Sequence, residues 1–514
     1  MLSPRLFAVC TLLTSVCASV CASVTTYPRP ALYSASTDFS LTVGGTSVPT
    51  VKFYDGYDYA QLSMDEGKDT EYKITLSSGA SISSYSISPK KLKIAATVSG
   101  STLTFKVKKA YYLIVKINSL KEFVIVADPS ETDKPASSGS GIFNVKDYNA
   151  DNTGKTLNTG IQDALNAGKG HIVYVPPGIY LTGNIVIPDG TSLYLAGGSV
   201  LRFTGNPADY KNMYYKPGLG YGTWWISTAI NSNNIKIYGR GTLDANGYGY
   251  QNGRNVSQAL VPAGTQNFVA DGLLIRESSF WTVVPTQSNN VYLNNLKMLN
   301  RIDMKQNDGI DVVESTNVFT TRAIAIAHDD SFSTKTWPED DNDIFKAYPY
   351  PPRPLSNVTF TDLVSWTRCY SFKVGQGVYN YQQGITFQDG VTYTAAVGLG
   401  VDHKFGDGVA RDLTWKNIEI EALAGENMPG VATWMAIFVE ISGRGIGPIE
   451  NSLVENIRIY DLGAKDAWIK GYNSSCKVVN TKLKNIYLND NTTPTTDLKA
   501  LKVVHMNTLN TTIE

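Results

Sequence analysis

Short runs of alternating apolar and polar residues fill most of the chain. Between about Val24 and Ala127 they recur every 8 to 15 residues, as in FSLTV, EYKITLSS and TLTFKVKK, with Gly, Ser and Asp between them. Alternation of period two with regular turns predicts a small β-sandwich over residues 24–127. No carboxylate pair, histidine cluster or cysteine stands out in this region, so we expect an accessory domain.

The pattern changes after residue 127. Residues 128–141, DPSETDKPASSGSG, have the composition of a linker. The segment TLNTGIQDALNAGKG then predicts the one convincing helix of the chain, with Ile161, Ala164 and Leu165 on one apolar face.

A long series of short strands follows, and several of them open with an asparagine: Asn233, Asn289, Asn317 and Asn357. Units of about 20 to 40 residues with two or three short strands each predict the coils of a right-handed parallel β-helix over residues 142–514. The helix would then cap its open N-terminal end. The fold class is therefore all-β, a right-handed parallel β-helix preceded by a small β-sandwich. A β-propeller is the alternative, but no fixed blade period is present.

Composition narrows the choice of partners. Lys plus Arg and Asp plus Glu both number 45, so no net charge attracts the chain to nucleic acid or to an anionic membrane. Residues 1–22 combine one positive charge, an apolar core and small residues, which predicts a signal peptide and a secreted, extracellular protein. We also expect a monomer, with no cofactor and no metal.

Exported proteins can carry disulfides and glycans. Cys369 and Cys476 remain after removal of the leader, and they either form one disulfide or stay free and buried. Five N-x-S/T triplets are candidate glycosylation sites, at Asn255, Asn357, Asn473, Asn491 and Asn510.

The strongest chemical signal lies between Gln306 and Trp337. Asp308 and Asp311 stand at one end of this stretch, and the pair Asp329 and Asp330 stands 21 and 22 residues after Asp308, a plausible length for one coil. Carboxylates stacked one coil apart repel, so at least one should have a raised pKa and keep its proton. An acid beside bases is what glycosidic bond cleavage requires. Asp-Asp pairs are also common on solvated loops, as at Asp340 and Asp341, so spacing alone does not decide.

The amino-acid sequences of these segments are more specific than their spacing. NDGIDVVES followed by AHDDSF resembles the paired aspartate blocks of glycoside hydrolase family 28, the polygalacturonases and their relatives. YGRGTLDANG, RESSFWTV and VYVPPGIYLTG resemble upstream blocks of the same family, in the correct order. The resemblance implies Asp329 as general acid, Asp308 and Asp330 as water-activating carboxylates, and hydrolysis with inversion. Asp311 is then a supporting neighbour.

Two family elements are altered. The counterpart of the Gly-His-Gly block, RCYSFKVGQGV, offers Tyr370 or Gln376 and no histidine. The counterpart of the Arg-x-Lys triplet, GVDHKFGDG, keeps Lys404 but has Asp402 where arginine would bind a sugar carboxylate. The candidate substrate-binding residues are Lys404, Tyr370, Gln376, His328, Asp311 and Trp337. His328 is equally compatible with a structural role. Packing in the core is the alternative role of four tryptophans: Trp337, Trp281, Trp224 and Trp225.

The layout of a β-sandwich before a β-helix is similar to that of glycoside hydrolase family 49, the dextranases and isopullulanases, which cut neutral α-glucans. We therefore predict a secreted inverting glycoside hydrolase of the polygalacturonase-like group, acting on a pectin-type substrate. The alternatives are a hydrolase of a neutral α-glucan, a glycan-binding β-helix without catalysis, and a polysaccharide lyase that needs Ca²⁺ and a basic proton acceptor.

Overall fold

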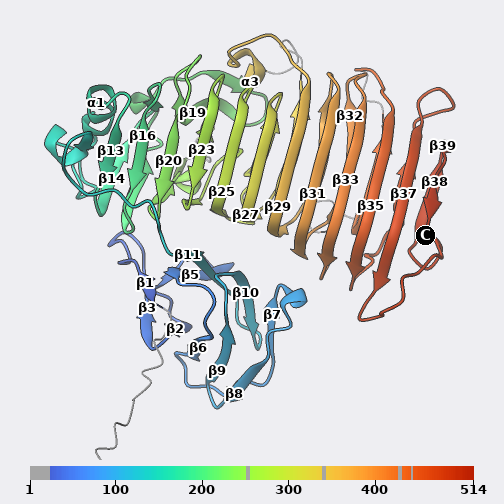
Figure 1. The fold of residues 1–514 in the computed structure, drawn as a ribbon, viewed down its shortest axis with the longest axis horizontal. Helices are drawn as coiled ribbons and strands as arrows, with labels where there is room; N and C mark the ends of the chain where they lie inside the picture. The colour runs from blue at the N-terminus through green and yellow to red at the C-terminus, as the bar shows by residue number, and fades with distance from the viewer. Residues whose placement is uncertain (1–22, 251–254, 338–342, 426–430, 441–443) are drawn as a thin grey trace, which may run out of the picture.

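The structure is a computed structural model that describes residues 23–250, 255–337, 343–425, 431–440 and 444–514. It contains two β-rich units, a small sandwich and a long parallel β-helix whose coils stack from left to right in Figure 1. This confirms the predicted fold class and excludes the propeller. The predicted signal peptide, residues 1–22, and the pair Asp340 and Asp341 lie outside the described residues.

Two sheets form the sandwich and enclose their own apolar core, which includes Leu41, Phe105 and Ile125. The first sheet comprises β1 (Val24–Thr26), β4 (Thr50–Lys52), β5 (Tyr57–Met64), β7 (Tyr85–Ser88), β10 (Tyr112–Ile117) and β11 (Glu122–Pro129). The second comprises β2 (Phe39–Val43), β3 (Thr46–Val48), β6 (Thr70–Leu76), β8 (Ala96–Ser99) and β9 (Thr102–Val107). A 3₁₀ turn, η1 (Lys90–Leu92), follows β7.

The β-helix is built on one sheet of 18 strands that runs its whole length. These strands are β12 (Ile142–Asn144), β13 (Ile172–Val175), β14 (Gly178–Thr182), β16 (Ser192–Leu195), β17 (Ser199–Phe203), β20 (Lys236–Gly239), β21 (Thr242–Asp244), β23 (Gln266–Asp271), β24 (Leu274–Arg276), β25 (Asn289–Leu299), β27 (Thr316–Ala327), β29 (Leu355–Thr367), β31 (Gln382–Thr394), β33 (Ala410–Ile420), β35 (Ile449–Ile459), β37 (Val478–Leu488), β39 (Thr508–Leu509) and β40 (Thr512–Ile513).

Two shorter sheets close the coils. The seven-stranded sheet contains β26 (Ile310–Val313), β28 (Phe332–Thr336), β30 (Tyr370–Val378), β32 (Val397–Phe405), β34 (Thr433–Val439), β36 (Ala467–Lys470) and β38 (Val503–Met506). The four-stranded sheet contains β15 (Ile185–Ile187), β18 (Tyr214–Lys216), β19 (Gly220–Thr228) and β22 (Asn255–Val261). The short helical elements are η2 (Val145–Tyr148), α1 (Gly160–Ala167), η3 (Pro207–Asp209), α2 (Gly247–Tyr250) and α3 (Asp343–Lys346).

Like residues stack on like residues along the core. Val318 pairs with Val358, Val358 with Ile385 and Ile385 with Leu413, and all four side chains are buried. Each coil thus covers the apolar surface of its neighbour. The burial of this apolar area stabilises the fold. The predicted helix, α1, covers the first coils with Ile161, whose side chain joins the same core.

Asparagines that open the strands form a ladder on the outside of the helix. Asn267, Asn290, Asn317 and Asn357 each adopt a left-handed backbone with φ of 55° or 56°. The Nδ2 group of each donates to the Oδ1 atom of the asparagine one coil earlier, over 2.6 to 3.1 Å, beginning at Asn233. Asparagine suits these positions because it tolerates the left-handed region and supplies both a donor and an acceptor.

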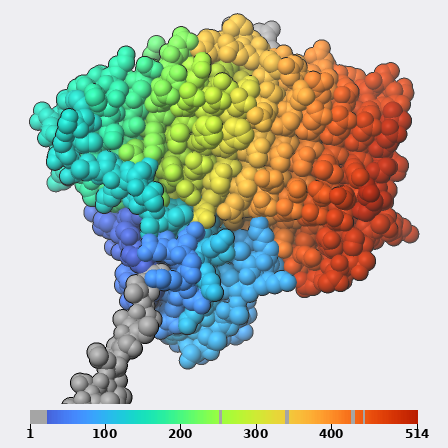
Figure 2. Space-filling model, viewed as in Figure 1, coloured from blue at the N-terminus to red at the C-terminus, as the bar shows by residue number. Residues whose placement is uncertain are grey.

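The sandwich packs against the coils in the middle of the long sheet (Figures 1 and 2). A shared apolar cluster joins Tyr57 to Leu299 and Trp366 of the helix. Within it the guanidinium of Arg276 lies 4.1 Å from the ring centre of Tyr33, and the Tyr57 hydroxyl donates to the carbonyl oxygen of Asn300 at 2.8 Å. The sandwich therefore contacts the turn that leads from β25 toward Asp308.

Cys369 and Cys476 are both buried and neither forms a disulfide, so the alternative of a disulfide is wrong. Within the described ranges, no helix is long and apolar enough to cross a membrane. The five predicted glycosylation sites stay predictions.

The ladder predicts a graded loss of stability at Asn317. Alanine there removes an amide that donates to one neighbour and accepts from the next, and it leaves a residue with Cβ in the left-handed region. We expect Asn317→Ala to lower the free energy of unfolding by about 2 to 3 kcal/mol in a denaturant titration. Asn317→Gly, which keeps the backbone conformation relaxed, should lose less. Equal stability of wild type and Asn317→Ala would contradict a stabilising ladder.

Candidate active site

The aspartates of the Gln306–Trp337 stretch meet where the long sheet turns into the seven-stranded sheet. Asp308 lies two residues before β26, and Asp329 and Asp330 lie between β27 and β28. The pairing of Ile310 with Phe332 fixes the coil at the predicted offset of 22 residues, so Asp308 and Asp330 occupy equivalent positions in consecutive coils.

Close contact between these coils depends on Gly309. Its N–H donates to the Asp330 carbonyl oxygen at 2.9 Å, and a Cβ atom there would lie 2.3 Å from the Ser331 carbonyl oxygen. Glycine is therefore required between Asp308 and β26.

Two buried asparagines hold the acidic segments together. The Nδ2 group of Asn300 donates to the Asn307 carbonyl oxygen at 3.0 Å, and the Oδ1 atom of Asn307 accepts from the N–H of His328 at 2.7 Å. Since Asn307 precedes Asp308 and His328 precedes Asp329, this network sets the positions of both carboxylates relative to each other.

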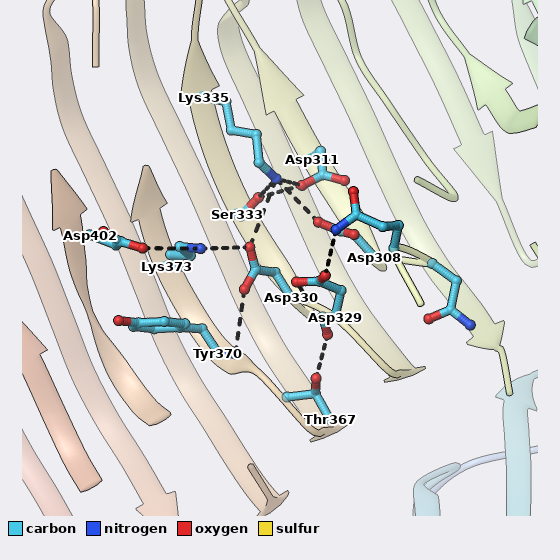
Figure 3. Close-up of polar contacts among 12 residues, drawn as sticks. Asp308, Asp311, Asp329, Asp330, Ser333, Lys335, Thr367, Tyr370, Lys373 and Asp402 are labelled. Carbon is cyan, nitrogen blue, oxygen red and sulfur yellow. Dashed lines mark hydrogen bonds and ion pairs between the residues drawn. The ribbon is translucent and has the colours of Figure 1, made fainter. Parts of the chain in front are cut away.

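The floor of the site is the outward face of β26, β28 and β30, and it carries two buried lysines (Figure 3). Lys335 ion-pairs with Asp311, lies 3.3 Å from the Oδ2 atom of Asp308 and 3.9 Å from that of Asp330. Its Nζ atom is also 2.7 Å from the Ser333 hydroxyl, which itself donates to Asp311. The ammonium of Lys335 therefore interacts with three carboxylates.

Lys373 forms the second junction. Its Nζ atom lies 3.0 Å from the Oδ2 atom of Asp330 and 3.7 Å from that of Asp402 (Figure 3). Although burial opposes the charged form, these carboxylates raise the pKa of Lys373. The carboxylates of Asp311 and Asp308 act in the same way on the pKa of Lys335. Both lysines are therefore fixed positive charges.

The pKa values of Asp308 and Asp330 are shifted in opposite directions. Burial, followed by repulsion from Asp311 and Asp329, raises the pKa of Asp308 well above its ordinary value, and Lys335 offsets only part of this. The pKa of Asp330 is lowered: burial would raise it, but the ammonium groups of Lys373 and Lys335 outweigh burial. Asp308 therefore favours the protonated form and Asp330 the ionised form.

Asp329 is the most accessible of the three predicted catalytic residues. It is partly buried, whereas Asp308 and Asp330 are buried. Its Oδ2 atom accepts from the Gln306 side-chain amide at 3.2 Å, and its Oδ1 atom accepts from the Asp330 N–H at 3.0 Å.

The three aspartates open into one cleft of about 390 Å³. The described residues that line it are Lys216, Trp281, Gln306, Asp308, Asp329, Asp330, Lys335, Trp337, Phe345, Lys373, Gln376, Phe405 and Arg444.

Of the predicted substrate-binding residues, Trp337 and Gln376 line this cleft. Asp311 lies beneath it as the ion-pair partner of Lys335. The structure places the other three outside the lining. Tyr370 is buried with its ring 4.7 Å from the Lys373 Nζ atom, His328 is buried behind the Asn307 amide, and Lys404 pairs with Glu440 at 3.3 Å.

The cleft also contains five polar residues that were not predicted from the sequence: Lys216, Gln306, Lys335, Lys373 and Arg444. A signal for two of them was present, because Lys335 and Lys373 are the only charged residues of β28 and β30, and the coil register places Lys373 next to Ser333. A charged residue within a strand core is unusual and points to a paired partner. Lys216 and Arg444 lie far from the acidic segments in sequence, so no local pattern links them to the site.

One group of described residues brings potential metal ligands together. Oxygen atoms of Asp329 and Asp330 and the sulfur atom of Cys369 lie within 4.8 Å of one another. The Lys373 ammonium already neutralises Asp330, and burial raises the pKa of Cys369, which disfavours the thiolate that binds metals. The residues therefore fit a metal poorly.

Residues 175–340 match the sequence model of glycosyl hydrolases family 28. This range contains Asp308, Asp311, Asp329 and Asp330. Exo-poly-alpha-D-galacturonosidase of Dickeya chrysanthemi is 33% identical over 119 residues, 21% of this chain and 20% of that protein. Endo-polygalacturonase of Pectobacterium carotovorum subsp. carotovorum is 34% identical over 100 residues, 18% of this chain and 25% of that protein. The chain thus aligns with only a fifth to a quarter of the length of these relatives.

Solved structures share the fold over greater lengths. Dex49A from Penicillium minioluteum has a TM-score of 0.62 at 14% identity and covers 95% of this chain and 96% of its own. The family 28 exopolygalacturonase of Yersinia enterocolitica has a TM-score of 0.53 at 16% identity and covers 87% of this chain and 96% of its own.

The expected resemblance is therefore confirmed: the acidic coils, within residues 175–340, match glycosyl hydrolases family 28, on a fold whose overall layout is similar to that of Dex49A.

Proposed function

We propose that the protein hydrolyses glycosidic bonds of a polysaccharide, with inversion, and that a pectin-type polymer is the substrate. The observation that carries this proposal is the meeting of Asp308, Asp329 and Asp330 in one cleft, where Asp330 is held ionised and Asp308 favours the protonated form. A carboxylate that stays ionised beside an accessible carboxyl group is what single-displacement hydrolysis needs. The two polygalacturonan-cleaving relatives support the substrate class.

In this proposal Asp329, the most accessible of the three aspartates, protonates the leaving oxygen. Asp330, held ionised by Lys373, takes the proton of the attacking water. Asp308 lines the same cleft and stays protonated between reactions. Its Oδ1 atom is buried without a hydrogen-bond partner among the described residues.

A neutral α-glucan is the second candidate substrate. The observation that favours it is Asp402, which occupies the position of the family's carboxylate-binding arginine and is buried against Lys373. A screen of polygalacturonate, rhamnogalacturonan, dextran and pullulan for released reducing sugar distinguishes the two.

Replacement of the proposed acid or base should abolish most of the activity. On whichever polymer is cut, we expect Asp329→Asn and Asp330→Asn to lower kcat by about 10²- to 10⁴-fold, the usual contribution of general acid or base catalysis. Asp303→Asn, on the neighbouring turn but paired with Arg301, is the matched control. Full activity of Asp329→Asn, or a product with retained anomeric configuration by NMR, would contradict the mechanism.

The Lys373 junction predicts how activity depends on pH. Removal of its ammonium in Lys373→Gln should raise the pKa of Asp330, so the acidic limb of the kcat/KM profile should move to higher pH. Asp402→Asn frees Lys373 to interact with Asp330 alone, so this limb should move to lower pH. Thermal denaturation of both variants checks that they fold, since Lys373→Gln removes the ammonium that two buried carboxylates share. Identical acidic limbs in wild type and Asp402→Asn would refute the assignment of Asp330 as base.

Activity in the presence of EDTA distinguishes hydrolysis from elimination by a Ca²⁺-dependent lyase. Hydrolysis by these aspartates and a water molecule should release reducing sugar at an unchanged rate in EDTA, without an unsaturated uronate in the ultraviolet spectrum. Loss of activity in EDTA together with that chromophore in untreated samples would identify a lyase instead.

A further inference from the structure

Lys216 is a cation of the cleft that belongs to neither lysine junction. It ends β18, whose pairing with β19 sets Lys216 opposite Gly220. Its side chain is partly buried and lines the cleft together with Asp308 and Asp329. The Nζ atom lies 5.2 Å from the ring centre of Phe280, so an aromatic face supports the ammonium from the protein side.

The other two cleft lysines are saturated by protein carboxylates. Lys335 has Asp308, Asp311 and Asp330 around it, and Lys373 has two carboxylates. Lys216 differs from both, because among the residues that the structure describes none places a carboxylate within 4.0 Å of its ammonium. Burial accordingly lowers the pKa of Lys216, and the charges of Asp308 and Asp329 oppose this only in part.

A lysine whose sole role was to neutralise the acids would approach them as Lys335 does. Lys216 instead faces the same open volume as Asp329 from another strand, with space between them. Withdrawal of an ammonium from water without a partner costs free energy, and an anion bound in the cleft would recover it.

We propose that Lys216 binds a carboxylate of the substrate, which makes the cleft selective for an acidic polysaccharide over a neutral one. This rests on the proposed function and names its substrate class. Lys216 would supply the recognition expected of Lys404, which is outside the cleft and paired with Glu440. Trp281 and Phe345, both buried, are apolar residues of the same lining.

The test measures binding without turnover. In an Asp329→Asn background, calorimetry compares trigalacturonate with its methyl ester, which keeps the sugar but lacks the charge. With Lys216 present, the acid should bind roughly ten- to a hundredfold more tightly than the ester, the usual range for a charge-assisted contact. Lys216→Met should bind both alike. Lys216→Arg should retain the preference, and so should Lys169→Met, which removes an exposed lysine just after α1.

Three results would overturn the inference: Lys216→Met weakens acid and ester equally, Lys404→Met and not Lys216→Met removes the preference, or the parent protein prefers isomaltotriose to trigalacturonate. Hydrolysis is scored separately, on the protein with Asp329 intact. Cleavage of dextran alone would refute Lys216 selectivity and leave hydrolysis standing. Preferential binding of trigalacturonate without release of reducing sugar from any polymer would support Lys216 and refute the hydrolase.

Discussion

The site depends on the attraction between two buried ammonium groups and the carboxylates around them. Asp308, Asp311, Asp330 and Asp402 are all buried, and such a cluster is stable only when its charges are paired or protonated. Lys335 and Lys373 supply two positive charges for four acids, so charge balance favours some of the acids in protonated form. The arrangement thus yields protonated and ionised aspartates together in one cleft.

The β-helix is what makes this charge density possible. Parallel stacking places equivalent residues of consecutive coils about 4.8 Å apart, so short strands bring distant side chains into one row. Asn300 and Asn307 then hold the turn before Asp308 against the turn before Asp329. Because Tyr57 of the sandwich donates to Asn300, the accessory domain buttresses the same turn.

Period-two alternation, the asparagines at strand starts and the early apolar helix were enough to predict the fold, because each reflects a local rule of backbone or packing. The spacing of Asp308 and Asp330 predicted their juxtaposition, since it equals one coil. Lys216 could not be found in this way, because its place in the cleft comes from a hairpin about 90 residues upstream of Asp308. The family resemblance placed Lys404 at the substrate, but its side chain pairs with Glu440.

The most direct test of the central claim is an infrared titration of the aspartate carboxyl groups in the free protein, with Asp308→Asn and Asp330→Asn for assignment. A protonated carboxyl band that persists above the ordinary aspartate range and disappears in Asp308→Asn is the predicted result, together with a carboxylate band that survives at low pH and disappears in Asp330→Asn. If both groups titrate within the ordinary range, the lysines do not divide the acids, and the proposed acid and base roles fail.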